Sequence, residues 1–134
     1  MTFRRLDEST LVAIRQFTAA DIVEAASAGI RLIVNNRPDG EEPGQPTSAE
    51  IGAAAGAAGL DYRHIPIAGA FPPEQVEAMA RALEQGPVLA FCRSGTRSTY
   101  LWALARAKRG AAAGESVAAA AAAGYDLAPI RAWL

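Results

Sequence analysis

The sequence has very few of the residues that cross-link small proteins or hold metal ions. Its 134 residues include one cysteine, Cys92, and one histidine, His64. A single cysteine excludes an internal disulfide and most cysteine-based metal sites, and a single histidine excludes a multi-histidine centre. We therefore expect neither a bound metal nor a cofactor.

Neither sign of charge is in excess, and no hydrophobic run is long. The 13 Lys and Arg residues nearly balance the 14 Asp and Glu residues, giving a net charge of −1, so bulk charge predicts no nucleic-acid partner. The alanine-rich stretch at 118–123 is too short to span a membrane, and residues 1–8 lack the apolar core of a signal peptide. We expect no membrane partner and a reduced, cytoplasmic setting, while the oligomeric state stays open.

The composition is otherwise that of an ordinary globular protein, with 51% hydrophobic and 20% charged residues, and predicts one domain over residues 1–134. Strands are expected at residues 11–14, 30–34, 62–67 and 88–91. Helices are expected after Thr18, from Ser48, after Pro72 and from Ser98, with two more at 115–123 and 127–133. This alternation is typical of an α/β fold with a mostly parallel sheet of four to five strands, flanked by helices.

Three loops follow predicted strands and are expected to converge at one edge of the sheet. They are residues 36–47, 68–71 and 92–98. Ligands of parallel sheets bind beyond the carboxyl ends of the strands, so a cleft is predicted there. Trp102, Trp133 and His64 are instead expected to be core residues.

The residues at 92–98, Cys-Arg-Ser-Gly-Thr-Arg-Ser, join a predicted strand to a predicted helix. A cysteine at that junction faces the positive end of the helix dipole, and Arg93 and Arg97 lie within five residues of it. Both features favour the thiolate, the reactive form of cysteine. The pattern predicts that Cys92 is a nucleophile, and the alternative is a small buried hydrophobic residue.

The remainder of this loop is suited to holding an anion. Unpaired backbone N–H groups at a helix start bind oxyanions, so the expected substrate-binding residues are Arg93, Ser94, Gly95 and Thr96. Gly95 supplies a tight bend, and Arg97 closes the loop over the anion with a forked pair of donors. Ser98 is expected to cap the helix or to hydrogen-bond the sulfur.

Four segments carry a family resemblance: residues 34–42 (Val-Asn-Asn-Arg-Pro-Asp-Gly-Glu-Glu), 59–67 (Gly-Leu-Asp-Tyr-Arg-His-Ile-Pro-Ile), 92–98 and 123–126 (Ala-Gly-Tyr-Asp). Through them the chain resembles the β-lactamase-hydrolase-like protein phosphatase-like domain family, which is related to dual-specificity protein phosphatases. The resemblance implies a cysteine-phosphatase fold. It also implies a phosphate ester or another small oxyanion as substrate.

On that resemblance the Cys92 thiolate attacks phosphorus, while backbone N–H groups of residues 93–97 hold the phosphoryl oxygens. Arg97 stabilises their charge in the transition state, and Ser98 eases the departure of the sulfur.

The resemblance leaves the general acid to be found elsewhere. Dual-specificity phosphatases carry an aspartate on the loop that corresponds to residues 68–71, and this loop has no acid. Asp39 is taken as the catalytic acid, with Glu41 and Glu42 as the other candidates. Arg37 is expected either to bind the substrate anion or to pair with these acids.

The spacing within the cysteine loop favours a different reaction. Cysteine phosphatases place the arginine six positions after the cysteine, whereas Arg97 stands five positions after Cys92, as is common in rhodanese sulfurtransferases, whose loop this one also resembles. In a sulfurtransferase Cys92 would carry a persulfide, and Arg93 and Arg97 would bind an anionic donor such as thiosulfate. A third hypothesis is a module that binds phosphate without turnover.

Overall fold

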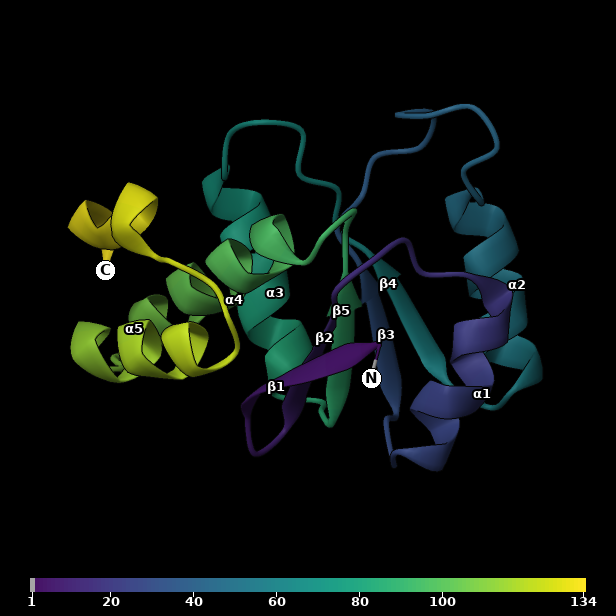
Figure 1. Cartoon of the computed structure of the whole chain (residues 1–134), viewed down its shortest axis with the longest axis horizontal. Helices are drawn as coiled ribbons and strands as arrows, with labels where there is room; N and C mark the ends of the chain where they lie inside the picture. The colour runs from purple at the N-terminus through teal and green to yellow at the C-terminus, as the bar shows by residue number, and fades with distance from the viewer. Residues whose placement is uncertain (1) are drawn as a thin grey trace.

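The computed structural model describes residues 2–134, in which a five-stranded sheet lies between two layers of helices (Figure 1). Strand β1 (Phe3–Asp7) is antiparallel to β2 (Thr10–Ala13). Strands β3 (Leu32–Asn35), β4 (Asp61–His64) and β5 (Val88–Phe91) run parallel to β2, and the order across the sheet is β1-β2-β5-β3-β4. The predicted α/β fold with a mostly parallel sheet is therefore confirmed.

The central strands present alternate side chains to two separate hydrophobic layers, as the period of a strand requires. Val34 and Ala90 face the layer covered by α3 (Pro73–Leu83) and α4 (Thr96–Lys108). Ile33 and Leu89 face the layer covered by α1 (Ala19–Ser27) and α2 (Ser48–Ala57), on the opposite side of the sheet in Figure 1. Helix α5 (Ala113–Ala122) packs against α4 and β1, and a 3-10 helix, η1 (Ala128–Trp133), follows it.

Most helix starts follow the capping signals of the sequence. Thr18 caps α1 and Pro73 begins α3, as predicted. The cap of α2 is Thr47 rather than the predicted Ser48. The Thr47 hydroxyl accepts the N–H of Glu50 at 3.1 Å, and the Glu50 carboxylate accepts the N–H of Thr47, which completes a capping box.

Several predictions about individual positions are wrong. Strand β1 had not been predicted, and His64 is not a core residue. His64 is exposed at the end of the edge strand β4, where its Nε2 lies 2.9 Å from the carbonyl oxygen of Arg37. Trp102 is buried as predicted, but Trp133 is 65% exposed.

The loops that leave β3, β4 and β5 emerge at the same end of the sheet, at the top of Figure 1. Backbone hydrogen bonds tie their starts together: Asn36 donates to the Phe91 carbonyl at 2.7 Å, and Ile67 donates to the Asn36 carbonyl at 2.9 Å. The predicted convergence of three loops is confirmed. None of the helices in residues 2–134 is long and apolar enough to cross a membrane.

Candidate active site

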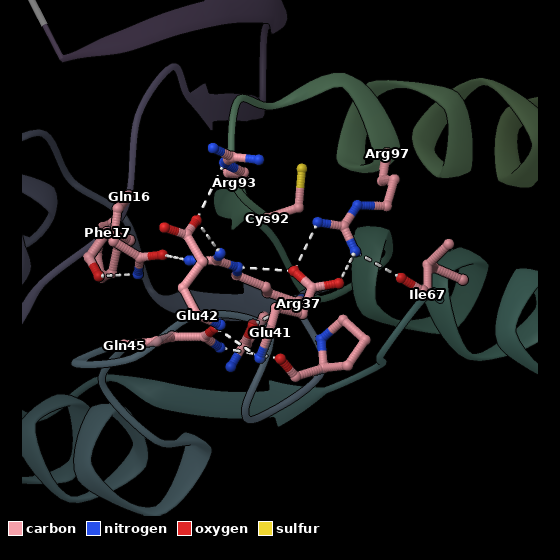
Figure 2. Close-up of polar contacts among 12 residues, drawn as sticks. Gln16, Phe17, Arg37, Glu41, Glu42, Gln45, Ile67, Cys92, Arg93 and Arg97 are labelled. Carbon is pink, nitrogen blue, oxygen red and sulfur yellow. Dashed lines mark hydrogen bonds and ion pairs between the residues drawn. The ribbon is translucent and has the colours of Figure 1, made fainter. Parts of the chain in front are cut away.

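Cys92 follows strand β5 directly, and helix α4 begins at Thr96 rather than at the predicted Ser98. The cysteine is buried, with 1% of its surface exposed. Its sulfur accepts the N–H of Gly95 at 3.2 Å, and the side chain of Arg97 lies beside it (Figure 2). Because α4 starts here, the first N–H groups of the helix have no acceptor within it. The sulfur therefore lies against the polar turn at the start of α4.

Gly95 and Tyr125 fix the shape of this turn. Gly95 caps α4 with φ +94°, a left-handed conformation that favours glycine. A Cβ at this position would lie 2.8 Å from the carbonyl oxygen of Ala13 and would collide with the hydroxyl of Tyr125. That hydroxyl donates to the Ser94 carbonyl at 2.8 Å. Burial raises the pKa of Tyr125, so its hydroxyl stays protonated as a donor.

Ser98 does not contact the sulfur. Its side chain is fully buried, and its hydroxyl donates to the Oδ1 of Asn36 at 2.8 Å. Asn36 in turn donates through Nδ2 to the carbonyl of Ile65 at 2.9 Å. A serine hydroxyl has one hydrogen to donate, so it cannot also serve the sulfur in this arrangement. Neither predicted role of Ser98, as the cap of α4 or as the partner of Cys92, is observed; it joins α4 to the β3 loop instead.

Arg97 is held by a carboxylate from the loop between β3 and α2. Its Nη1 donates to Glu41 Oε2 at 2.8 Å and to the Ile67 carbonyl at 2.8 Å, and its Nη2 donates to Glu41 Oε1 at 2.9 Å (Figure 2). The hydrogen bond to Glu41 raises the pKa of Arg97. The same pairing, supported by Arg37, lowers the pKa of Glu41 from 4.5 to about 2. Glu41 is therefore ionised at neutral pH.

Arg37 is buried, and each of its three guanidinium nitrogens donates to a local side chain. Its Nε donates to Glu41 at 2.7 Å, its Nη2 to Glu42 at 2.6 Å, and its Nη1 to the side-chain carbonyl of Gln16. Of the two predicted roles, pairing with the local acids is the one observed. Arg93, which is largely exposed, lies 3.1 Å from the same Glu42.

The predicted general acid, Asp39, is occupied elsewhere. Its Oδ1 accepts the backbone N–H of Ser48 at the start of α2 at 2.8 Å, and no polar contact joins it to residues 92–98 within the part of the chain that the structure describes. The pairing of Glu41 with two guanidinium groups likewise leaves it without a proton to give. In the turn after Cys92, the exposed hydroxyl oxygens of Ser94 and Thr96 lie 3.2 Å from each other.

The structure brings the side chain of Arg97 beside Cys92, whereas Arg93 pairs with Glu42, and three residues that the sequence does not single out complete the surroundings. These three residues are Asn36, Gln16 and Tyr125. Asn36 and Tyr125 do lie within the segments that carried the family resemblance, and that was the available signal. Gln16 stands outside these segments, and only the folded structure brings it to Arg37.

Comparison with known proteins agrees with this description. The family model "Beta-lactamase hydrolase-like protein, phosphatase-like domain" matches residues 2–109. A beta-lactamase hydrolase-like protein of Agrobacterium fabrum is 43% identical over 112 residues, which cover 79% of this chain and 25% of that protein. One from Xylella fastidiosa is 40% identical over 118 residues, covering 85% of this chain and 27% of that protein. The chain thus spans about a quarter of the length of these curated relatives.

Solved structures show the same fold. A candidate phosphatase from Neisseria meningitidis superimposes with a TM-score of 0.84 and 37% identity, covering 98% of this chain and 95% of that one. Tk-PTP in its active form has a TM-score of 0.72 at 19% identity, covering 98% of this chain and 91% of that one. Kinase-associated phosphatase, with its catalytic-site cysteine replaced by serine, has a TM-score of 0.70 at 14% identity, covering 92% and 82%. The chain belongs to the beta-lactamase hydrolase-like protein, phosphatase-like domain family.

Proposed function

We propose that this chain hydrolyses phosphate esters through a thiolate at Cys92, with Arg97 and the N–H groups at the start of α4 binding the phosphoryl oxygens. The observation that carries the proposal is the position of the sulfur, which accepts the Gly95 N–H at the base of a helix-start turn and lies beside a guanidinium. Family membership and the cysteine-phosphatase fold support it.

The proposed reaction has two displacements at phosphorus. The thiolate attacks phosphorus, an S–P bond forms, and the P–O bond to the leaving group breaks, so that the leaving oxygen departs with the electron pair. Water then attacks the thiophosphate, releasing inorganic phosphate and regenerating the Cys92 thiolate. Arg97 stabilises the charge that gathers on the phosphoryl oxygens in both steps.

The state of the acids predicts which esters react fastest. Asp39 accepts the Ser48 N–H, Glu41 is ionised, and Glu42 is paired with Arg37 and Arg93, so none of the three is placed to protonate a leaving oxygen. General acid catalysis increases the rate by about 10²–10⁴-fold. Without it, esters whose leaving group is unstable as an anion react slowly. We expect kcat for a nitrophenyl phosphate to exceed that for a simple alkyl phosphate by at least about 10²-fold, measured as phosphate release.

The decisive experiment compares two substrates on wild type and Cys92→Ser. Phosphate release from an aryl phosphate that falls to the background rate in Cys92→Ser supports the proposal. Wild-type protein that releases no phosphate but forms thiocyanate from thiosulfate and cyanide, and that gains the mass of one sulfur atom, overturns it. Binding of inorganic phosphate without either reaction identifies a binding module.

Two observations favour sulfur transfer as the second candidate function. Arg97 stands five positions after Cys92, and transfer of a sulfane sulfur needs no proton donor for its leaving group. In this reaction the thiolate attacks the outer sulfur of thiosulfate, an S–S bond forms, and sulfite leaves with the electron pair. Cyanide then attacks the outer sulfur of the persulfide and departs as thiocyanate, which restores the thiolate.

A further inference from the structure

The guanidinium of Arg97 carries five N–H bonds, and the structure accounts for three of them. One hydrogen on Nη1 and one on Nη2 point at the two oxygens of Glu41, and the other hydrogen of Nη1 points at the Ile67 carbonyl. Glu41 therefore holds the guanidinium by its end. The Nε–H and the second hydrogen of Nη2 lie along the other edge of the planar guanidinium. They take no part in these three hydrogen bonds.

This remaining side of the fork faces Cys92. In Figure 2 Glu41 contacts the guanidinium of Arg97 from below, and the Ile67 carbonyl contacts it on the side away from Cys92. The remaining edge of the guanidinium is turned toward the cysteine sulfur. Cys92 is among the groups that raise the pKa of Arg97, consistent with that proximity. An anion brought to the sulfur would thus meet two parallel N–H donors, the geometry with which arginine binds phosphate and carboxylate groups.

Glu41 is itself held by a rigid partner. Its Oε1 accepts the Nε–H of Arg37 at 2.7 Å, and the Arg37 side chain is only 2% exposed. Arg37 is fixed in turn by Gln16 and Glu42, so the carboxylate that orients Arg97 is anchored to a buried group. Glu41 and Arg97 are 56 residues apart in the chain, and this contact joins the β3 loop to α4.

We propose that Glu41 is the positioning residue for Arg97: it holds one end of the guanidinium so that the Nε and Nη2 donors face an anion at Cys92. This inference rests on the proposed function only for the identity of that anion. The opposite possibility is a latch, in which the Glu41 carboxylate competes with the substrate for Arg97 and must leave before an anion binds. The two possibilities predict opposite effects when the charge of Glu41 is removed.

The test uses Glu41→Gln in the full chain, with Glu77→Gln as the matched control. Glu77 also bridges several cations, Lys108 and Arg109 among them, at the other end of α4. Cys92 is alkylated with iodoacetate, an anion, and with iodoacetamide, its neutral counterpart, and the ratio of the two rate constants is measured. This ratio reports how well the site directs an anion to the sulfur, and it does not require phosphatase activity.

If Glu41 positions Arg97, Glu41→Gln lowers the iodoacetate-to-iodoacetamide ratio and weakens binding of inorganic phosphate, while Glu77→Gln leaves both unchanged. Displacing an aligned group by about 1 Å can cost about 10²-fold in rate, so kcat on an aryl phosphate should fall by about that factor, with a smaller change in KM. A ratio that rises, with tighter phosphate binding, establishes the latch and overturns the proposal. An unchanged ratio overturns it as well.

The failure of this inference is distinct from the failure of the proposed function. If the wild type releases no phosphate from an aryl ester but the alkylation ratio still falls in Glu41→Gln, positioning by Glu41 stands and the substrate assignment fails. If phosphate is released and the alkylation ratio does not fall in Glu41→Gln, the proposed function stands and positioning by Glu41 fails.

Discussion

A methyl group at position 95 has no space in the native turn. Gly95→Ala forces an L-residue into φ +94° and drives its Cβ against the Ala13 carbonyl and the Tyr125 hydroxyl. The left-handed conformation alone costs about 1–2 kcal/mol, and the collision adds to it. Gly29→Ala is the matched control, because Gly29 has φ +85° with nothing within 4 Å of a new Cβ. We expect urea unfolding to show a larger loss of stability for Gly95→Ala, and equal losses would contradict the crowding at position 95.

Ser98 offers a second test at the residue scale. Its hydroxyl is a partner of the buried Asn36 amide oxygen rather than of the sulfur. Ser98→Ala leaves that oxygen unsatisfied, which typically costs about 1–3 kcal/mol of unfolding free energy. The reactivity of Cys92 toward iodoacetamide should be little changed, because the Ser98 hydroxyl donates to Asn36 and not to the sulfur. A variant of undiminished stability but altered thiol reactivity would instead place the hydroxyl on the sulfur.

The loop between β3 and α2 depends on one buried cation. Arg37→Met removes one guanidinium partner from Glu41 and one from Glu42, which then keep only Arg97 and Arg93, and it removes the donor to the Gln16 side chain. We expect the loop to open locally. Hydrogen exchange should lose protection at the Gln45 and Ser48 amides, which donate to groups within the loop.

The control for this prediction is Arg81→Met. Arg81 pairs with Glu77 on the surface of α3 and is 72% exposed. Arg81→Met should therefore lower the free energy of unfolding by at most about 1 kcal/mol. Equal protection of the loop amides in both variants would mean that Arg37 does not organise this segment.

The elements that were predictable are those specified by neighbouring residues. The strand, turn and helix around Cys92 follow from an apolar run, a glycine and a helical pattern in direct succession, and Pro73 and Thr18 mark helix starts locally. Strand β1 lacks such a signal, because it is stabilised by pairing with β2 at an edge of the sheet. The role of Ser98 was misassigned because its acceptor, Asn36, is 62 residues away in the chain. The Glu41–Arg97 contact likewise joins residues 56 positions apart, so neighbouring residues do not predict it.

At the scale of the whole molecule, the paired carboxylates predict loss of stability in acid. Hydrogen bonding to Arg97, supported by Arg37, lowers the pKa of Glu41 from 4.5 to about 2. Burial raises the pKa of Asp7, but hydrogen bonds from Trp102 and Ser9 outweigh it and leave that pKa below the ordinary value. In both cases the unfolded chain binds protons more readily than the folded one. The resulting stabilisation of the folded state is fully present above the pKa that each carboxyl has in the unfolded chain. It is lost as the pH falls through the lower pKa that the carboxyl has in the folded protein.

The corresponding measurement is the free energy of unfolding as a function of pH. In wild type it should decline as the pH falls from 4.5 toward 2, and Glu41→Gln should make the decline shallower. A wild-type curve that is flat over this interval, or one that Glu41→Gln leaves unaltered, would contradict the ion pair as the source of acid sensitivity.

The hydrogen bond from Tyr125 to the Ser94 carbonyl has a consequence for where this unit can be divided. The family model matches residues 2–109 and includes Cys92 and Arg97, but Tyr125 lies beyond it. A fragment trimmed to residues 2–109 would keep Cys92 and Arg97. It would lose the Tyr125 phenol, which donates to the Ser94 carbonyl in the turn. Protein engineers who graft or shorten this domain therefore need to carry the segment through Tyr125 with it.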